Sequence, residues 1–386
     1  GSAPPDGPFS AGERVQLRAR SPKVRADAVL GLQRYPPSPA LFDVVSAAIR
    51  DPDAEVRRAG ALVACLLEPD EAMRATSQAR ALSDAMSGLL DTLAETVMDD
   101  ESGRTHATAT DLAEAIATFD QDPAAIVARG IAWLQSTATD LRTIGAHLLV
   151  RRSEQAADAL ARGLRDKHPD VRDACARALS RAATLPPTVG RVIAGVIASA
   201  RGGRGKGGRS ARASFDVGDL VCALGRVRGA PDLVERTLRP LLDDEDVRGS
   251  VIEAFGAWDA PAATRRECVW PWLADHRVKT EAAEALHEIG VEIEEILAGI
   301  EALGRRDEKS RLARGGAYLA VARRDARAIA PIERMLDDHS EAVVSHALDL
   351  LAWAMELQPA ARPALERAAK HRSKEIQVAA RKRLRT

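Results

Sequence analysis

The chain has 386 residues, of which 46% are apolar and 29% are charged, and this composition excludes an intrinsically disordered protein. Its 55 basic and 56 acidic residues give a formal net charge of −1, so binding to nucleic acid or to an anionic membrane would require a local patch. No apolar run reaches the roughly 20 residues of a membrane-spanning helix, so we expect no membrane partner. The cysteines form no CxxC pair, which fits free thiols in a reducing compartment, so we expect a cytoplasmic protein.

The N-terminal stretch, residues 1–12, is rich in proline and glycine. It has neither the basic stretch nor the apolar core of a signal peptide. We therefore expect residues 1–12 to form a disordered tag or linker and residues 13–386 to form the folded part of the chain.

From residue 13 onward the sequence repeats an acidic turn, an apolar anchor residue that is often followed by arginine, and a helical pattern. Neighbouring anchors mostly lie about 30 to 34 residues apart, and a second apolar residue usually follows on the same helical face. The turn residues suit a helix N-terminus, and the preceding half of each repeat carries another apolar stripe, so each repeat is predicted to be a pair of helices. The anchors are Val24, Val56, Leu141, Val171, Val247, Val278, Val343 and Ile376, with weaker ones at Val217, Leu312 and near Thr108.

The clearest copies of the pattern are residues 171–179 (VRDACARAL) and 278–286 (VKTEAAEAL). They resemble HEAT repeats, especially the short HEAT-like repeats of phycobilin-lyase-type proteins, and the resemblance covers most of residues 20–386. It implies an all-α fold, a right-handed α-α superhelix of about ten to eleven helix-pair repeats in a single solenoid. It also implies a structural ladder in which arginines pair with turn aspartates of adjacent repeats. These arginines are Arg25, Arg57, Arg142, Arg172 and Arg248.

The spacing of the repeats stretches near residues 68–110, where residues 79–98 are predicted to form one longer amphipathic helix. Two interpretations are open for the acidic residues at its end: a solvated face of an extended repeat, or a patch for a cation or a basic partner. The ligand spacing of an EF-hand loop is absent. The acidic residues are Asp91, Glu95, Asp99, Asp100 and Glu101.

Residues 201–212 (RGGRGKGGRSAR) interrupt the repeats with five basic residues, five glycines and no acid. Glycine disfavours a helix, so this segment is predicted to be a surface loop. It is either a flexible insertion or an RGG-like arm that contacts phosphates, and its lack of aromatic residues weakens the second interpretation. The candidate nucleic-acid contacts are Arg201, Arg204, Lys206, Arg209 and Arg212.

The C-terminal helix is also basic, with Arg381, Lys382 and Arg383 near its end. The polar outer face of a last repeat accounts for this charge. If this helix shares a face with the basic loop, the same three residues become candidate nucleic-acid contacts.

Three tryptophans, Trp258, Trp270 and Trp272, lie close together near acidic residues. HEAT-like DNA glycosylases place aromatic side chains and a carboxylate along a basic groove, but the surrounding helices here are not basic. Burial between repeats is therefore the favoured interpretation, and a binding hot spot for a protein partner is the alternative.

The sequence contains no GxSxG, Walker or HExxH motif, and His287-Glu288 is its only His-Glu dipeptide, whereas HEAT-type deoxyhypusine hydroxylases use several. We therefore expect no catalytic residue, no cofactor and no metal. The pattern favours a non-enzymatic scaffold or adaptor that binds a protein partner along the solenoid surface. The alternatives are a nucleic-acid-binding solenoid that uses residues 201–212 and the C-terminal helix, and, less favoured, a HEAT-type DNA glycosylase or lyase. The oligomeric state is open.

Overall fold

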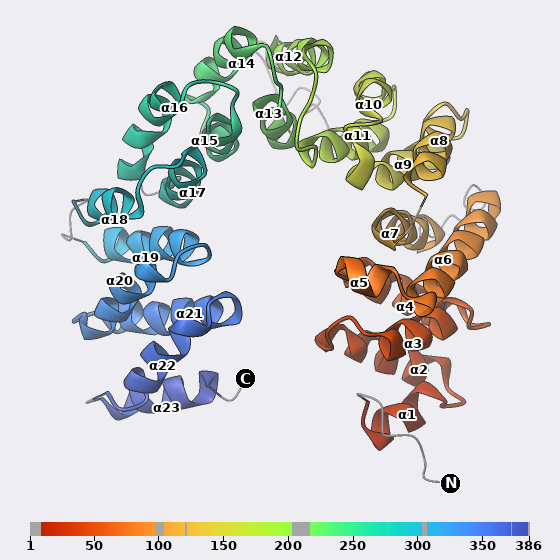
Figure 1. The fold of residues 1–386 in the computed structure, drawn as a ribbon, viewed down its shortest axis with the longest axis horizontal. Coiled ribbons are helices and arrows are strands. Elements are labelled where there is room, and N and C mark those ends of the chain that lie inside the picture. Colours follow the sequence, from red (N-terminus) through yellow and green to blue (C-terminus); the bar gives the residue numbers. More distant parts are fainter. Residues whose placement is uncertain are drawn as a thin grey trace, which may run out of the picture. The chain divides into compact units, whose positions relative to one another are not determined.

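The computed structural model describes residues 9–96, 104–119, 122–202, 217–275, 277–302, 307–371 and 373–384. Within these ranges the chain forms α-helices and short 3₁₀ turns and contains no β-strand, which confirms the predicted all-α fold (Figure 1). Contacts divide the chain into two compact units, unit 1 (residues 1–216) and unit 2 (residues 217–386). No helix of the described residues has the length and hydropathy needed to cross a bilayer.

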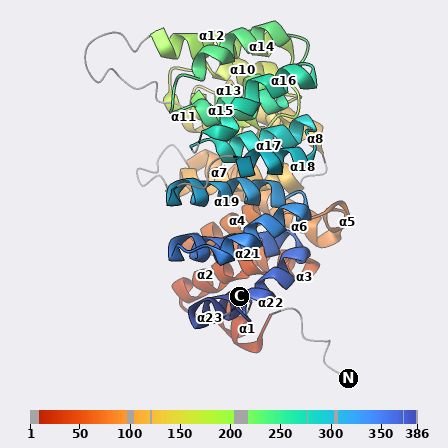
Figure 2. The same ribbon diagram turned by 90° about the vertical axis from the view of Figure 1, so that its left-hand side faces the viewer.

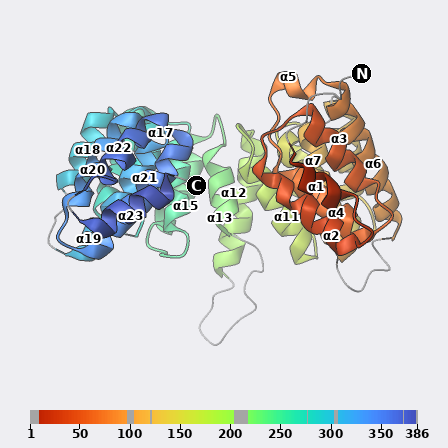
Figure 3. The same ribbon diagram turned by 90° about the horizontal axis from the view of Figure 1, so that it is seen from below.

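Unit 1 is a stack of helix pairs in which each second helix packs against its first helix and against the second helix of the next pair. This arrangement buries a continuous core along the stack. In the view of Figure 3, α1 and α2 lie in front of the later helices of unit 1. The first helices are α1 (Ala11–Leu17), α3 (Pro39–Ile49), α6 (Ser77–Thr96), α8 (Pro123–Leu134) and α10 (Ala157–Gly163). The second helices are α2 (Pro22–Leu30), α4 (Ala54–Leu66), α7 (Arg104–Phe119), α9 (Thr139–Leu148) and α11 (Pro169–Ser180). The short α5 (Glu71–Arg74) precedes α6, and α12 (Pro187–Gly202) follows α11.

Unit 2 repeats this arrangement, and Figure 2 shows its second helices following one another in chain order. The second helices are α13 (Val217–Gly225), α15 (Arg248–Ala257), α17 (Lys279–Ile289), α19 (Glu308–Ala322), α21 (Glu341–Leu357) and α23 (Lys374–Arg383). Between them lie α14 (Pro231–Leu238), α16 (Ala262–Val269), α18 (Ile293–Ala302), α20 (Ile329–Arg334) and α22 (Arg362–Ala368).

The predicted anchors lie in or next to the first turn of the second helices, or, for Thr108, in the second turn of α7. Most are buried, as expected for the start of an inward-facing stripe, and the exposed fractions of Val56, Val171 and Val343 are 2% or less. Val24 differs because 40% of its surface is exposed. It belongs to the first helix pair that the structure describes, and within the described residues this pair packs against one neighbouring pair.

The structure differs from the expected boundaries at two places. Helix α1 begins at Ala11, before residue 13, because Ser10 and Glu13 form a capping box and Phe9 is buried edge-on against Tyr35. Helix α12 extends to Gly202, into the expected loop at 201–212. The longer helix expected near residues 68–110 is the 20-residue α6, which is flanked by α5 and α7.

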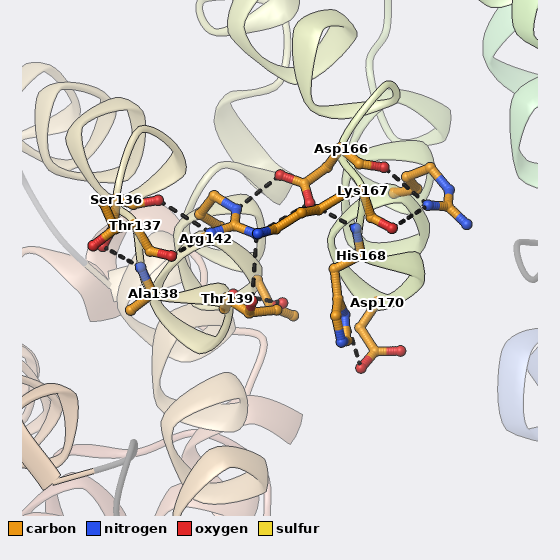
Figure 4. Close-up of polar contacts among 11 residues, drawn as sticks. Ser136, Thr137, Ala138, Thr139, Arg142, Asp166, Lys167, His168 and Asp170 are labelled. Carbon is orange, nitrogen blue, oxygen red and sulfur yellow. Dashed lines mark hydrogen bonds and ion pairs between the residues drawn. The ribbon is translucent and has the colours of Figure 1, made fainter.

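Arg142 shows how one repeat is joined to the next (Figure 4). Its Nε lies 2.7 Å from Oδ2 of Asp166 and its Nη2 lies 3.1 Å from Oδ1, so the guanidinium holds the carboxylate of the next turn with two hydrogen bonds. Its Nη1 donates to the backbone carbonyls of Ser136 and Thr137 at 3.2 and 2.9 Å. One buried side chain therefore satisfies the carbonyls of its own turn and binds the turn that follows.

The ladder implied by the HEAT resemblance is present at Arg25 and Arg248 as well, and Arg311 extends it. Arg57 and Arg172 also donate to backbone carbonyls of their own turns. The further pairs that join neighbouring turns are Arg25–Asp51, Arg248–Asp275 and Arg311–Asp338.

Small residues allow the second helices to pack closely. A Cβ atom on Gly225 of α13 would lie 2.6 Å from the carbonyl oxygen of Ala254 on α15, and one on Gly256 would lie 2.9 Å from the Cβ of Ala285 on α17. Such contacts explain how a chain with 3% aromatic residues can fill its core with alanine, leucine and valine.

Replacing Arg142 with alanine should lower the free energy of unfolding of unit 1 by about 3 kcal/mol, because the change removes the charged donor of Asp166 and of two turn carbonyls. The control is Arg162→Ala on the exposed side of α10, with an expected change within about 0.5 kcal/mol. Urea unfolding monitored by circular dichroism measures the free energy of unfolding of both variants. Equal destabilisation by the two variants would show that the ladder does not hold the repeats together.

The Arg25 guanidinium donates to Asp51 and holds the pKa of that carboxyl below its usual value. A folded-state pKa below the unfolded value means that this stabilisation is complete above pH about 3.9 and disappears as the pH falls through the folded-state pKa. Asp51→Asn should therefore be less stable than the natural chain at pH 7, and the difference should shrink as the pH falls from 4 toward 2.5. Urea unfolding across this range is the measurement, and a difference independent of pH would refute the assignment.

Candidate functional site

The three tryptophans proposed from the sequence do not form one exposed patch. Trp258 is buried, with 3% of its surface exposed, and its Nε1 donates to the carbonyl of Pro231 at 3.2 Å. Trp270 and Trp272 are half-buried in the 3₁₀ turn after α16, where the guanidinium groups of Arg266 and Arg248 lie 4.8 and 5.1 Å from their ring centroids. Trp258 therefore packs inside unit 2, while the other two rings are covered by arginines.

The basic candidates divide into two groups. On α23, Arg383 pairs with Asp349 and Arg381 donates to the carbonyl of Ala369, whereas Lys382 is exposed. Arg201 belongs to the last turn of α12, and the positions of the other loop candidates lie outside the described residues. Those loop candidates are Arg204, Lys206, Arg209 and Arg212. Their contact with nucleic acid remains a prediction.

A first cavity opens on the second helices of unit 1 and is called here the leucine groove. Its volume is about 620 Å³, and Leu30, Leu62 and Leu93 supply its apolar lining, with Arg57 and Arg58 among its charged residues. Leu62 is 39% exposed and Leu66, one turn later on α4, is 55% exposed. Helix α4 thus presents two leucines outward at a spacing of four residues, on one helical face.

A second cavity, called here the arginine pocket, lies at the C-terminal ends of the second helices and has a volume of about 420 Å³. Cys65 of α4 lines it, so α4 contributes to both cavities. Its basic lining comes from α5, from the 3₁₀ turn after α9, and from α11 and the residue that follows it. The basic residues are Arg74, Arg151, Arg152, Arg177 and Arg181.

A carboxylate bridges the wall of the arginine pocket. Glu114 on α7 places Oε1 2.7 Å from Nδ1 of the buried His147 on α9, and this hydrogen bond lowers the pKa of Glu114 against the opposing effect of burial. Its Oε2 lies 4.0 Å from Sγ of Cys65. Burial raises the pKa of the Cys65 thiol to about 11, and the charge of Glu114 adds to the shift. At neutral pH the thiol is protonated, so this trio does not supply a nucleophile.

Most of the arginines in the pocket retain donors for a ligand. In the part of the chain that the structure describes, no carboxylate lies within ion-pair distance of Arg152, Arg177 or Arg181. The Nε atom of Arg152 is buried and has no hydrogen-bond partner there. Across the described residues of the chain, no group of three or more His, Cys, Asp or Glu side chains could hold a metal ion. The arrangement is therefore suited to binding an anion.

The arginine pocket was not predicted from the sequence, because its residues are spread between positions 65 and 181 and no local run of basic residues reveals it. Two partial signals exist: the doublet Arg151-Arg152, and the spacing of four between Arg177 and Arg181 on the polar face of α11.

Residues 157–184, which comprise α10, the acidic turn and α11, match the HEAT repeat. This segment is a HEAT repeat. The match includes residues 171–179, on which the resemblance was based, and it confirms the resemblance to HEAT repeats. The phycobilin-lyase subtype stays a prediction. In this HEAT repeat, the turn residue Asp166 receives the ladder hydrogen bonds, and α11 supplies Arg177 to the pocket.

Solved structures with a similar fold include an engineered protein, with a TM-score of 0.33 and 16% identity over 98% of this chain and 100% of that chain. Importin beta has a TM-score of 0.47 and 14% identity over 94% of this chain and 57% of its own. Kap121p bound to Pho4p has a TM-score of 0.42 and 13% identity over 95% of this chain and 44% of its own. The chain thus spans about half the length of these two proteins. No curated protein matches the sequence.

The Cys65 thiol should react with iodoacetamide at pH 8 about a hundredfold more slowly than an unperturbed cysteine, because its pKa of about 11 leaves little thiolate. Glu114→Gln should accelerate the reaction, since it removes the neighbouring negative charge and keeps a hydrogen-bonding side chain. Peptide mapping by mass spectrometry gives the rate at each cysteine. Alkylation of Cys65 as fast as that of glutathione would contradict the protonated state.

Proposed function

We propose that this chain is a non-enzymatic scaffold that binds a protein partner along the second helices of unit 1. One observation carries the proposal: α4 lines both the leucine groove and the arginine pocket. Apolar side chains next to a cluster of arginines are complementary to a protein segment that carries both apolar and acidic groups.

The exposed leucines favour a protein over a nucleic acid. Leu62 and Leu66 offer aliphatic surface, whereas proteins that bind single strands use aromatic platforms on which bases stack. A stacked-repeat architecture supports the same conclusion, because each repeat contacts its neighbours and leaves a long surface for a partner. A nucleic-acid-binding role for residues 201–212 and α23 remains the alternative.

A site-specific cross-linker tests this proposal. Benzoylphenylalanine in place of Leu66 should capture a protein in cells that make the chain, whereas the same cross-linker in place of Asp43, on the exposed side of α3, should not. Adding Leu62→Glu should reduce the yield of the adduct about tenfold, because it places a charge in the apolar groove.

Val378→Glu is the matched control, since Val378 is 66% exposed but belongs to α23 in unit 2, and it should leave the yield unchanged. Protease and nuclease digestion identify the chemical class of the adduct. Adducts that are nuclease-sensitive, or that form equally at both positions, would exclude a protein partner on this surface.

A further inference from the structure

We propose that the arginine pocket of unit 1 is a binding site for the dianion of a phosphate monoester. The inference deepens the proposed function, because the pocket lies beside the leucine groove on α4 and would select the anionic group of the partner. It can be tested with small ligands, in the absence of any partner.

The charge of the pocket is unbalanced. Five arginines line it against one carboxylate, Glu114, which is already hydrogen-bonded to His147. Glu68 lies 3.9 Å from Arg151 and its side chain is 84% exposed, so water screens that contact. In the described part of the chain Arg152, Arg177 and Arg181 have no carboxylate within ion-pair distance, so a ligand with a single negative charge would leave most of the charge of these three uncompensated.

The directions from which the arginines approach favour a tetrahedral group. Arg74 comes from α5, Arg151 and Arg152 come from the turn after α9, and Arg177 and Arg181 come from the end of α11. A carboxylate presents two oxygens in one plane, which one guanidinium can satisfy with two parallel hydrogen bonds. A phosphate monoester presents three terminal oxygens in different directions and carries a charge of about −1.5 to −2 at neutral pH. It can therefore accept from several guanidinium groups at once, including the unsatisfied Nε of Arg152.

The charge of each phosphate group distinguishes a monoester from a nucleic-acid backbone. A diester carries one negative charge, whereas a monoester carries about −1.5 to −2 at neutral pH. A monoester therefore neutralises more of the arginine charge at one position than a diester does.

Three small ligands that differ in charge and shape test the assignment on the full-length protein. Phenyl phosphate is tetrahedral and dianionic, phenyl sulfate is tetrahedral and singly charged, and benzoate is planar and singly charged. Isothermal titration at pH 7.5 should show that phenyl phosphate binds at least about tenfold more tightly than either of the others. Equal binding of the three ligands, or no binding of phenyl phosphate, would overturn the proposal.

The double variant Arg177→Gln/Arg181→Gln should weaken phenyl phosphate binding at least about tenfold, because it removes two exposed charges that need not disturb the core. The control Arg162→Gln/Arg191→Gln removes two exposed charges from the first helix α10 and from α12, and should change the affinity less than about twofold. Arg74→Gln is a second, independent pocket variant, and circular dichroism verifies the fold of each. Unchanged binding in both pocket variants would place the ligand elsewhere and overturn the assignment.

Peptides distinguish the two sources of such a group. A phosphoserine peptide with leucines beside the phosphate should bind more tightly than phenyl phosphate if the ligand belongs to a protein, whereas equal affinities indicate a small phosphorylated metabolite. Failure of the phosphate titrations together with successful cross-linking at Leu66 would reject the phosphate site and retain the scaffold. Successful phosphate titrations together with no cross-linking at Leu66 would retain the phosphate site and reject the protein partner.

Discussion

The arginine that joins two consecutive turns is the interaction on which the stacking of the repeats depends. In the best-formed case, Arg142 is held by two carbonyls of its own turn and itself holds the carboxylate of Asp166 in the next. Its partners in its own turn are backbone carbonyls, which any sequence supplies. The link therefore requires only the arginine and the aspartate to be kept in the sequence. The remaining surface positions of the second helices are then free to vary, which is how one architecture accommodates different binding surfaces.

The ladder and the candidate site lie at opposite ends of the same helices. The ladder arginines lie in or beside the first turn, where the acidic residues of the turn also favour the positive end of the helix dipole. The pocket residues Cys65, Thr118 and Arg177 lie toward the C-terminal ends of α4, α7 and α11. Cations are favoured at that end of a helix, so part of the arginine content has a local structural reason. That effect places an arginine near a helix end but does not make five of them line one cavity.

The sequence predicts features that depend on residues close together in the chain, and it fails for features that combine residues from distant repeats. The anchors and the turns repeat along the chain, so the pattern itself reveals them, and the resemblance to HEAT repeats implied the ladder arginines Arg25 and Arg142. Val24 follows the same pattern yet is exposed, because burial also depends on neighbouring repeats, and its helix pair packs against one other pair among the described residues. The arginine pocket combines residues from four repeats, and its members are individually ordinary polar residues of helix ends. No periodicity distinguishes Arg177 from other surface arginines until the fold places it next to Arg152.

The helix ends oppose anion binding in the arginine pocket. The C-terminal ends of α4, α7, α9 and α11 are directed toward it, and each contributes a partial charge of about −0.5, or roughly −2 in all. The guanidinium groups that line the pocket must first offset these dipoles and the carboxylate of Glu114 before they attract an anion. This requirement explains why an anion site at helix C-termini needs several cations, whereas a site at a helix N-terminus can rely on the backbone N–H groups.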